Sequence, residues 1–307
     1  MKVLVTGGAG FIGSHLTDSL IALGHDVVVV DNLSTGKREY VNPKAKFHQV
    51  DISDTTELSE IFLREKPDVV NHHAAQVNVR LSLAEPEVDG RINIMGSLNV
   101  IKGAIECGAK KMIFASTGGA IYGEPQVLPV SEKVSTNPLS PYGVAKLAVE
   151  QYIRVIATLN NLPYTILRYS NVYGPRQIAK GESGVIAVFT QRLLEGKEPV
   201  IFGDGSHTRD YVYVMDVIRA NMLAMGDGDG GTYNVGTGVE TDVNEVYMEL
   251  ESNLKTGIKA IHGDEIPGEV RHITLDCSLI KDELGWIPEF DFNQGVKETV
   301  KYYREII

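Results

Sequence analysis

The chain begins with a short apolar run over residues 2–6 that breaks into three regularly spaced glycines. Gly7, Gly10 and Gly13 follow the pattern G-x-x-G-x-x-G and precede a predicted helix over 11–23. Glycines at this spacing allow a tight turn, a close approach of the backbone to a pyrophosphate, and close packing of the helix on the strand. An ordinary turn does not need three glycines so placed, so the pattern favours a dinucleotide-binding βαβ unit.

Short β-type runs then alternate with helical patterns. We predict strands over 2–6, 26–30, 46–50, 68–73, 111–116 and 164–169. Strict alternation of strand and helix predicts an α/β fold with a doubly wound parallel sheet, the Rossmann type. The uninterrupted apolar run at 27–30 indicates that helices cover both faces of the sheet. Ligands of such sheets bind beyond the carboxyl ends of the strands.

After residue 173 the pattern loosens, and 174–184 and 196–209 look like loops. We predict an NAD-binding Rossmann domain over 1–173 and a smaller, discontinuous C-terminal α/β substrate lobe over 174–307. Runs at 211–214 and 232–235 are expected to return to the main sheet. The acidic, glycine-rich stretch 227–231 is expected to be a solvated turn, since the later ligands of a calcium loop are missing.

Charge and cysteine content exclude several classes of function. The net charge of −11 argues against nucleic acid or an anionic membrane as partner, because both require a basic surface. Two cysteines, Cys107 and Cys277, are too few for a disulfide framework or a zinc cluster, and no metal site is predicted. With no signal pattern or membrane-length run at the N-terminus, a cytoplasmic location is expected.

Acidic residues end the second and third predicted strands. Asp31 stands where a carboxylate accepts from the ribose hydroxyls and repels a 2′-phosphate, which favours NAD over NADP. Lys37 and Arg38 follow it, but a solvated turn is the better interpretation of this pair. Asp51 either meets the adenine or starts the next helix. Because Asp54 already caps that helix in a capping box with the glutamate three residues later, Asp51 is expected to be free for the ligand.

Tyr142 and Lys146 lie four residues apart, hence on one helical face, after the prolines at 138 and 141. A phenol with a pKa of about 10 acts as a base at neutral pH only if nearby positive charge favours its phenolate. The Lys146 ammonium and a positive nicotinamide are expected to supply that charge. This motif is common by chance, so its weight comes from the glycine motif that precedes it.

With both motifs in place, the chain resembles the extended short-chain dehydrogenase/reductase family, and within it the UDP-glucose (UDP-galactose) 4-epimerases. The resemblance spans nearly the whole chain. It rests on the glycine motif, Asp31, the segments 73–75, 92–97, 116–123 and 168–174, the Tyr142/Lys146 pair, and the segments 202–205, 209–211 and 268–271.

The resemblance implies NAD as cofactor and a UDP-hexose as substrate, and it implies a set of binding residues. Those expected at the cofactor are Gly7, Gly10, Phe11, Ile12, Gly13, Asp31, Asn32, Asp51, Ile52, His73, Ala74, Ala75, Asn93, Ser116, Tyr142, Lys146 and Tyr169. Those expected at the substrate are Thr117, Tyr142, Asn171, Val200, Phe202, Arg209, Arg271 and Ile273, with the two arginines on the diphosphate. Ile273 is expected to disfavour N-acetylated sugars.

Two departures from the family pattern affect this expectation. The family usually has a catalytic hydroxyl four residues before the tyrosine at position 122, where this chain has Gly118, so that Thr117 or Ser116 must replace it or Tyr142 must act alone. Ile266 stands where an arginine is frequent. The related dehydratases and decarboxylases carry an acid where this chain has Gly118 and Gly119, which disfavours elimination.

The predicted reaction is therefore reversible epimerisation at carbon 4 through a transient 4-keto sugar and tightly bound NAD. Tyr142 is the base, and Lys146 and a hydroxyl of Thr117 or Ser116 assist it. Alternatives are an epimerase of UDP-glucuronate or of a UDP-N-acetylhexosamine, a net oxidoreductase that releases NADH, and a nucleotide-sensing protein without activity. A homodimer is expected, since the helix at 141–159 carries more apolar surface than one sheet contact needs. The resemblance implies that it pairs through this helix and the one near 88–107.

Overall fold

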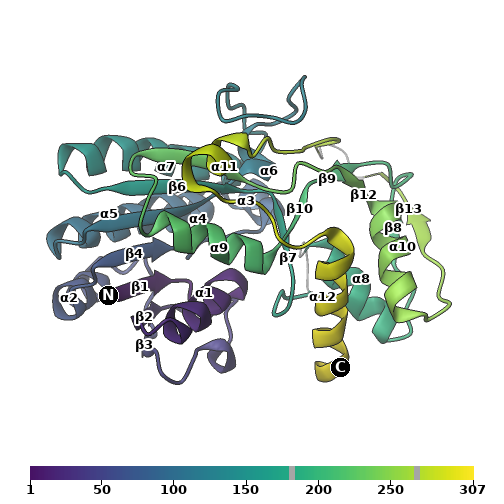
Figure 1. The fold of residues 1–307 in the computed structure, drawn as a ribbon, viewed down its shortest axis with the longest axis horizontal. Coiled ribbons are helices and arrows are strands. Elements are labelled where there is room, and N and C mark those ends of the chain that lie inside the picture. Colours follow the sequence, from purple (N-terminus) through teal and green to yellow (C-terminus); the bar gives the residue numbers. More distant parts are fainter. Residues whose placement is uncertain (180–183, 266–269) are drawn as a thin grey trace.

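The computed structural model describes residues 1–179, 184–265 and 270–307, and a seven-stranded parallel sheet forms its larger lobe (Figure 1). The strand order is β11-β6-β5-β4-β1-β2-β3. The bounds are β1 (Lys2–Thr6), β2 (Asp26–Val30), β3 (Lys46–His48), β4 (Val69–His72), β5 (Lys111–Thr117), β6 (Tyr164–Tyr169) and β11 (Gly231–Val235). All six predicted strands lie in this sheet, and the doubly wound α/β prediction is confirmed.

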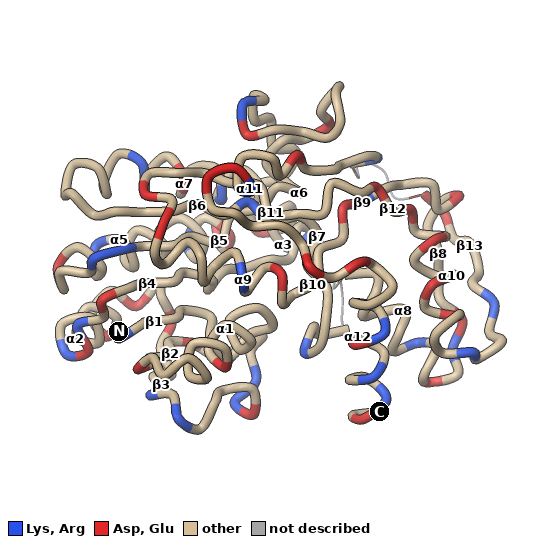
Figure 2. The backbone as a smooth tube through the Cα atoms, in the orientation of Figure 1, with Lys and Arg blue, Asp and Glu red and all other residues tan. Residues whose placement is uncertain are grey.

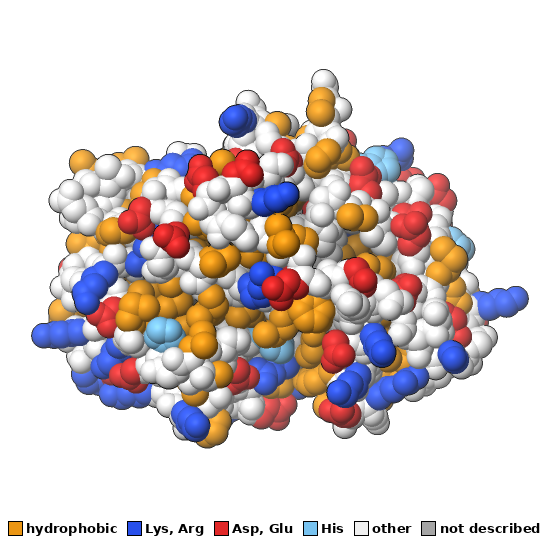
Figure 3. All heavy atoms as spheres, in the orientation of Figure 1, with side chains coloured by type: hydrophobic (Ala, Val, Ile, Leu, Met, Phe, Trp, Pro, Cys, Tyr) orange, Lys and Arg blue, Asp and Glu red, His pale blue; other side chains and the backbone are white. Residues whose placement is uncertain are grey.

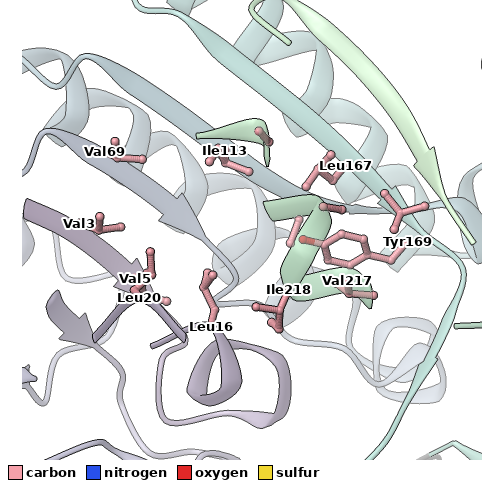
Figure 4. Close-up of a cluster of buried hydrophobic side chains, with 14 of the residues drawn as sticks. Val3, Val5, Leu16, Leu20, Val69, Ile113, Leu167, Tyr169, Val217 and Ile218 are labelled. Carbon is pink, nitrogen blue, oxygen red and sulfur yellow. The ribbon is translucent and has the colours of Figure 1, made fainter. Parts of the chain in front are cut away.

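Helices cover both faces of the sheet because successive strand side chains point to opposite sides. The helices of this lobe are α1 (Phe11–Ala22), α2 (Thr55–Glu65), α3 (Val79–Ala84), α4 (Pro86–Asp89), α5 (Ser97–Glu106), α6 (Gly118–Ile121), α7 (Pro141–Leu159), α9 (Val214–Ala224) and α11 (Ser278–Leu284), with a short 3-10 turn η1 (Arg38–Tyr40) and a π-helical turn η2 (Gly90–Gly96). Leu16 of α1 and Ile218 of α9 pack on Val3 and Val5 on one face (Figure 4). Residues of α2, α5 and α7 pack around Leu4 on the other face.

The second lobe holds the chain's remaining helices and short strands, and the C-terminus lies there, at the end of α12 (Figure 1). Its elements are β7 (Asn171–Tyr173), α8 (Val185–Leu194), β8 (Val200–Phe202), β9 (Thr208–Arg209), β10 (Tyr211–Tyr213), β12 (Thr241–Asp242), α10 (Val243–Leu254), β13 (Ile261–Gly263) and α12 (Phe292–Ile306). A separate apolar core joins α8, α10 and α12. The segment 196–209, which we expected to be a loop, contains the short strands β8 and β9.

One of the two predicted returns to the main sheet is wrong. β11 joins the sheet beside β6, with Val235 opposite Tyr169, as expected for 232–235. β10 instead pairs with β7 in a two-stranded sheet of its own. The physical reason is that β11 occupies the free edge of β6. β10 therefore pairs with β7, the short strand that follows β6 in the chain.

Charged residues of both signs are distributed over the two lobes. Figure 2 shows acidic residues along α10, and residues of both signs on α12. On the face shown in Figure 3, acidic, basic and apolar side chains are interspersed. Within the described ranges, every helix is too short or too polar to span a bilayer.

Candidate active site

At two positions of the glycine turn and the start of α1, the packing leaves no room for a side chain. Gly7 has a φ of +71°, and a Cβ there would lie 2.7 Å from the backbone nitrogen of Ala74. A Cβ on Gly13 would lie 2.2 Å from the carbonyl oxygen of Gly7. α1 begins after Gly10 with neither a side-chain cap nor an acidic residue in its first turn. Its free N–H groups and positive dipole end suit a pyrophosphate, so these residues fit NAD.

Asp31 ties the glycine turn to the end of β2. Its Oδ2 accepts from the Ala9 N–H at 3.0 Å and its Oδ1 from the Leu33 N–H at 2.8 Å. Burial raises the pKa of Asp31, and these two hydrogen bonds act against that rise. A carboxylate oxygen accepts more than one hydrogen bond, so both oxygens retain capacity for a ribose hydroxyl.

Asp51 follows β3 and accepts three hydrogen bonds, which leave its oxygens capacity for a ligand, as at Asp31. Its Oδ1 accepts from the backbone and hydroxyl of Ser53, and its Oδ2 accepts from Asn32 at 2.6 Å. Asp54 caps α2 as predicted, accepting from two backbone N–H groups of the first turn. Ile52 is buried, and its side chain lies close against Gly96 of η2.

Tyr142 and Lys146 are presented by the first two turns of α7, which Ser140 caps by accepting from the Gly143 N–H. The Lys146 side chain is buried, and its Nζ donates to the Ala115 carbonyl at 2.9 Å. Burial lowers the pKa of Lys146 to about 8, against the opposing charges of Asp89 and Glu150. The ammonium thus lies in the interior at the end of β5.

The Tyr142 phenol is half-buried, and burial raises its pKa above the ordinary value. The charge of Asp89 acts in the same direction, whereas a hydrogen bond with Thr117 acts to lower the pKa. Burial and Asp89 thus oppose formation of the phenolate at this position. A further positive charge is needed, as a bound oxidised nicotinamide would bring.

The two candidate hydroxyls at the end of β5 have different partners. Ser116 Oγ donates to buried Glu150 at 2.6 Å. Glu150 also accepts two hydrogen bonds from the Arg168 guanidinium, at 2.9 and 2.7 Å. Ser116 therefore belongs to a buried network that fastens α7 to the sheet. The Thr117 hydroxyl instead acts to lower the pKa of the Tyr142 phenol.

Thr117 and Asn171 meet beside Gly119. A Cβ at position 119 would lie 3.5 Å from Asn171 Oδ1 and 3.9 Å from Thr117 Oγ1, both ordinary contact distances. Two polar side chains predicted to bind substrate thus border the same glycine. Asn171 is held in place by its N–H, which donates to the carbonyl of Asp210 at 2.9 Å.

The end of β4 supplies a neutral histidine. The His73 ring stacks on Tyr169 with centroids 6.2 Å apart. Burial lowers the pKa of His73 to about 3, and its buried Nε2 has no hydrogen-bond partner among the described residues. Ala74, in the following loop, donates its N–H to Thr6 Oγ1 at 3.2 Å, and Ala75 comes next in the chain.

Sequence reasoning missed Asp89. This buried carboxylate at the end of α4 accepts from Asn93 and Gln76, each at 2.8 Å, and Asn93 returns a hydrogen bond to the Gln76 carbonyl. Its charge acts on both Tyr142 and Lys146. Its spacing of four residues from Asn93 on a helical segment is the signal that could have found it.

The second lobe brings the two expected arginines together. Arg209 Nη1 donates to the carbonyl of Thr208 at 2.8 Å and to that of Arg271 at 3.3 Å. Arg271 also pairs with Glu265 at 3.0 Å, and its side chain is largely exposed. Val200 and Phe202 lie on β8, with Phe202 exposed. The arginine position replaced by Ile266 lies outside the described residues, as do Gly268 and Glu269.

Ile273 lies in a small apolar cluster. Its side chain is 2% exposed and packs in the cluster formed by Ile121, Tyr122, Val130 and Leu275. The residue expected to border the sugar is therefore covered by its neighbours in this structure.

Comparison with known proteins gives consistent matches over the chain. The model of the NAD dependent epimerase/dehydratase family matches residues 3–236. The chain is 46% identical over 302 residues to a putative UDP-glucose 4-epimerase of Methanocaldococcus jannaschii, covering 98% of each chain.

Two solved structures are also similar. One is a UDP-glucose 4-epimerase of Thermotoga maritima with UDP-glucose, at a TM-score of 0.98 and 48% identity, covering 100% of this chain and 99% of the other. The second is a UDP-glucose 4-epimerase of Thermus thermophilus in complex with NAD, at a TM-score of 0.96 and 40% identity, covering 100% of both chains.

Proposed function

The chain belongs to the NAD-dependent epimerase/dehydratase family, and from this premise we propose that it interconverts UDP-glucose and UDP-galactose at carbon 4. The reaction passes through a transient 4-keto sugar. The observation that carries the proposal is the placement of Tyr142 and buried Lys146 on α7, with Lys146 bonded to Ala115 of β5, in the same sheet whose β1 leads into the glycine turn. The solved relatives with UDP-glucose and with NAD support both ligand assignments.

The residues that would hold NAD lie at the ends of β1, β2, β4 and β5. The turn from Gly7 to Gly13 would face the pyrophosphate, Asp31 would accept from the adenosine ribose, and Lys146 would donate to the nicotinamide ribose. When bound, NAD supplies the hydride acceptor for carbon 4 and a positive charge near the phenol. The division into an NAD-binding part over 1–173 and a sugar-nucleotide part over 174–307 belongs to the same proposal, with β11, α9 and α11 adding to the first.

The remaining chemistry comes from side chains of this chain. Tyr142 takes the proton of the 4-hydroxyl when carbon 4 is oxidised and returns it to the oxygen when carbon 4 is reduced. Thr117 hydrogen-bonds that oxygen, and Lys146 keeps a positive charge close to the phenol. Arg209 and Arg271 hold the diphosphate, which lets the loosely held sugar turn and present its other face.

Neither glycine at 118 and 119 offers an acid for chemistry beyond oxidation and reduction. An elimination or decarboxylation needs a group that protonates or polarises the keto sugar at a second position. In this chain the nearest side chains to Gly119 are those of Asn171 and Thr117, which are not acids. The site is therefore better suited to return the hydride than to modify the oxidised sugar.

We further infer a homodimer that pairs through α7 and the segment around η2. The inward face of α7 buries Ala145, Val149 and Ile153, while Val144, at 51%, and Val155, at 58%, remain exposed. Exposed apolar side chains on one helix face are typical of an interface. The cytoplasm is the proposed compartment, in keeping with two free cysteines.

The decisive test is interconversion of UDP-glucose and UDP-galactose by the purified protein without added NAD. Tyr142→Phe should retain bound NAD and lose at least about 100-fold in kcat. Tyr152→Phe is the matched control, because Tyr152 lies on the same helix with an exposed side chain, and it should retain activity. Absence of interconversion by the wild type, or a Tyr142→Phe rate within tenfold of wild type, refutes the proposal.

A further inference from the structure

The space beside Gly118, next to the catalytic hydroxyl, is already filled by Leu275. A Cβ built on Gly118 would lie 2.5 Å from Leu275 Cδ1 and 2.9 Å from Cδ2. Carbon atoms that are not bonded do not approach so closely, so either Leu275 or the backbone at 118 would have to move. Glycine at 118 and leucine at 275 are therefore sterically coupled.

Leu275 is held firmly in this position. Its side chain is fully buried, and its N–H donates to the carboxylate of buried Asp210 at 3.2 Å. The chain on both sides of it is hydrogen-bonded to Val130, whose N–H donates to the Thr274 carbonyl at 2.8 Å and whose carbonyl accepts from the Asp276 N–H at 2.9 Å. These bonds fix the backbone, and the side chain packs in the cluster of Ile121, Tyr122, Val130 and Ile273, so a side chain at 118 would have to displace Leu275 within a filled core.

The positions on either side of Gly118 differ in whether they can offer a hydroxyl to the site. Ser116 Oγ is turned into the buried network of Glu150. Gly119 has room for a Cβ at ordinary contact distances. Thr117, between these positions, has its Oγ1 beside Gly119 and Asn171, and it acts to lower the pKa of Tyr142. The three atoms nearest to a Cβ at 118 all belong to Leu275, which lies far away in the sequence.

We propose that Leu275 is a positioning residue that makes Thr117, and not residue 118, the source of the hydroxyl at the reacting oxygen. It acts by occupying the volume that a side chain at 118 needs. The inference rests on the proposed function, since it concerns the same hydroxyl. Leu275 lies four residues after Arg271 in the chain. The same segment therefore contributes both to holding the diphosphate and to selecting the hydroxyl.

A double-mutant cycle on thermal stability tests the packing directly and does not depend on activity. Gly118→Ala should lower Tm by about 3 °C or more in the wild type and should not lower it in Leu275→Ala. Ile273→Ala is the matched control, because it empties volume in the same cluster away from Gly118 and should leave the effect of Gly118→Ala unchanged. Where Leu275→Ala does not fold, Leu275→Val removes the two closest methyl groups. An effect of Gly118→Ala that is equal in all backgrounds overturns the proposal.

Relocation of the hydroxyl tests the functional part. Thr117→Val should lower kcat, and adding Leu275→Ala alone should not restore it. Adding Gly118→Ser together with Leu275→Ala should raise kcat at least tenfold above that of Thr117→Val/Leu275→Ala. A folded, NAD-containing triple variant without this recovery overturns the inference. If the wild type itself fails to interconvert the two sugars, the proposed function fails, and the stability cycle still decides whether Leu275 excludes a side chain at 118.

Discussion

Lys146→Met should change how the stability of the protein depends on pH. Burial lowers the pKa of Lys146 from 10.5 to about 8. Between these values the folded state has released the proton while the unfolded chain still binds it, so this lysine makes folding more favourable as the pH rises. At about 1.4 kcal/mol for each tenfold change, the full effect is about 3 kcal/mol, of which about 2.5 kcal/mol develops between pH 7 and pH 10. Methionine keeps the length of the side chain and cannot titrate.

The measurement is urea unfolding of nucleotide-free wild type and variant at pH 7 and pH 10. Relative to the variant, the wild type should gain about 2.5 kcal/mol in free energy of unfolding between the two pH values. Lys102→Met is the control, because the Lys102 side chain is 62% exposed and its replacement should give a difference that does not vary with pH. A difference between wild type and Lys146→Met that stays constant within about 0.5 kcal/mol, or that moves the other way, refutes a buried ammonium at this position.

Four other predictions follow from the site and the surface. Thr117→Val should lower kcat about 10- to 100-fold by removing a hydrogen bond made to the reacting oxygen, and an unchanged rate shows that this hydroxyl is dispensable. Asp31→Ala should release NAD on gel filtration, since it removes the acceptor for the ribose and the tie to the glycine turn; full retention contradicts this role. Val144→Glu should shift the mass seen by light scattering from dimer to monomer, and a wild type that is monomeric at micromolar concentration contradicts the dimer. UDP-glucose should have a higher kcat/KM than UDP-N-acetylglucosamine, and equal values would falsify the expected exclusion of the acetamide.

Predictions from the sequence were confirmed where a feature depends on residues close together in the chain. Continuous apolar runs bounded by turn residues located the six strands, because burial on both faces of a parallel sheet demands that composition. The glycine turn was predictable because closeness of approach and positive φ exclude other residues. Tyr142 and Lys146 were placed on one face by helical spacing alone, and both lie at the sheet end, where the β5 carbonyl of Ala115 accepts from Lys146.

Predictions failed or stayed open where two segments compete for one partner. The pattern of residues 211–214 resembles that of 232–235, and only the pairing of β11 with β6 decides that β10 must leave the main sheet. Which strand pairs with β6 depends on segments far apart in the sequence, and the periodicity of each segment gives no information about this competition.

By itself the sequence determined the class of fold, the dinucleotide turn and the reacting pair, because each depends on residues within a few positions of one another. Only the tertiary structure decided which hydroxyl faces Tyr142. Ser116 is withdrawn by a carboxylate on α7 and position 118 is closed by Leu275 from the second half of the chain. A close-packed interior admits one side chain in each volume, so the hydroxyl available to the proposed reaction depends on residues that pack beside β5 from elsewhere in the fold.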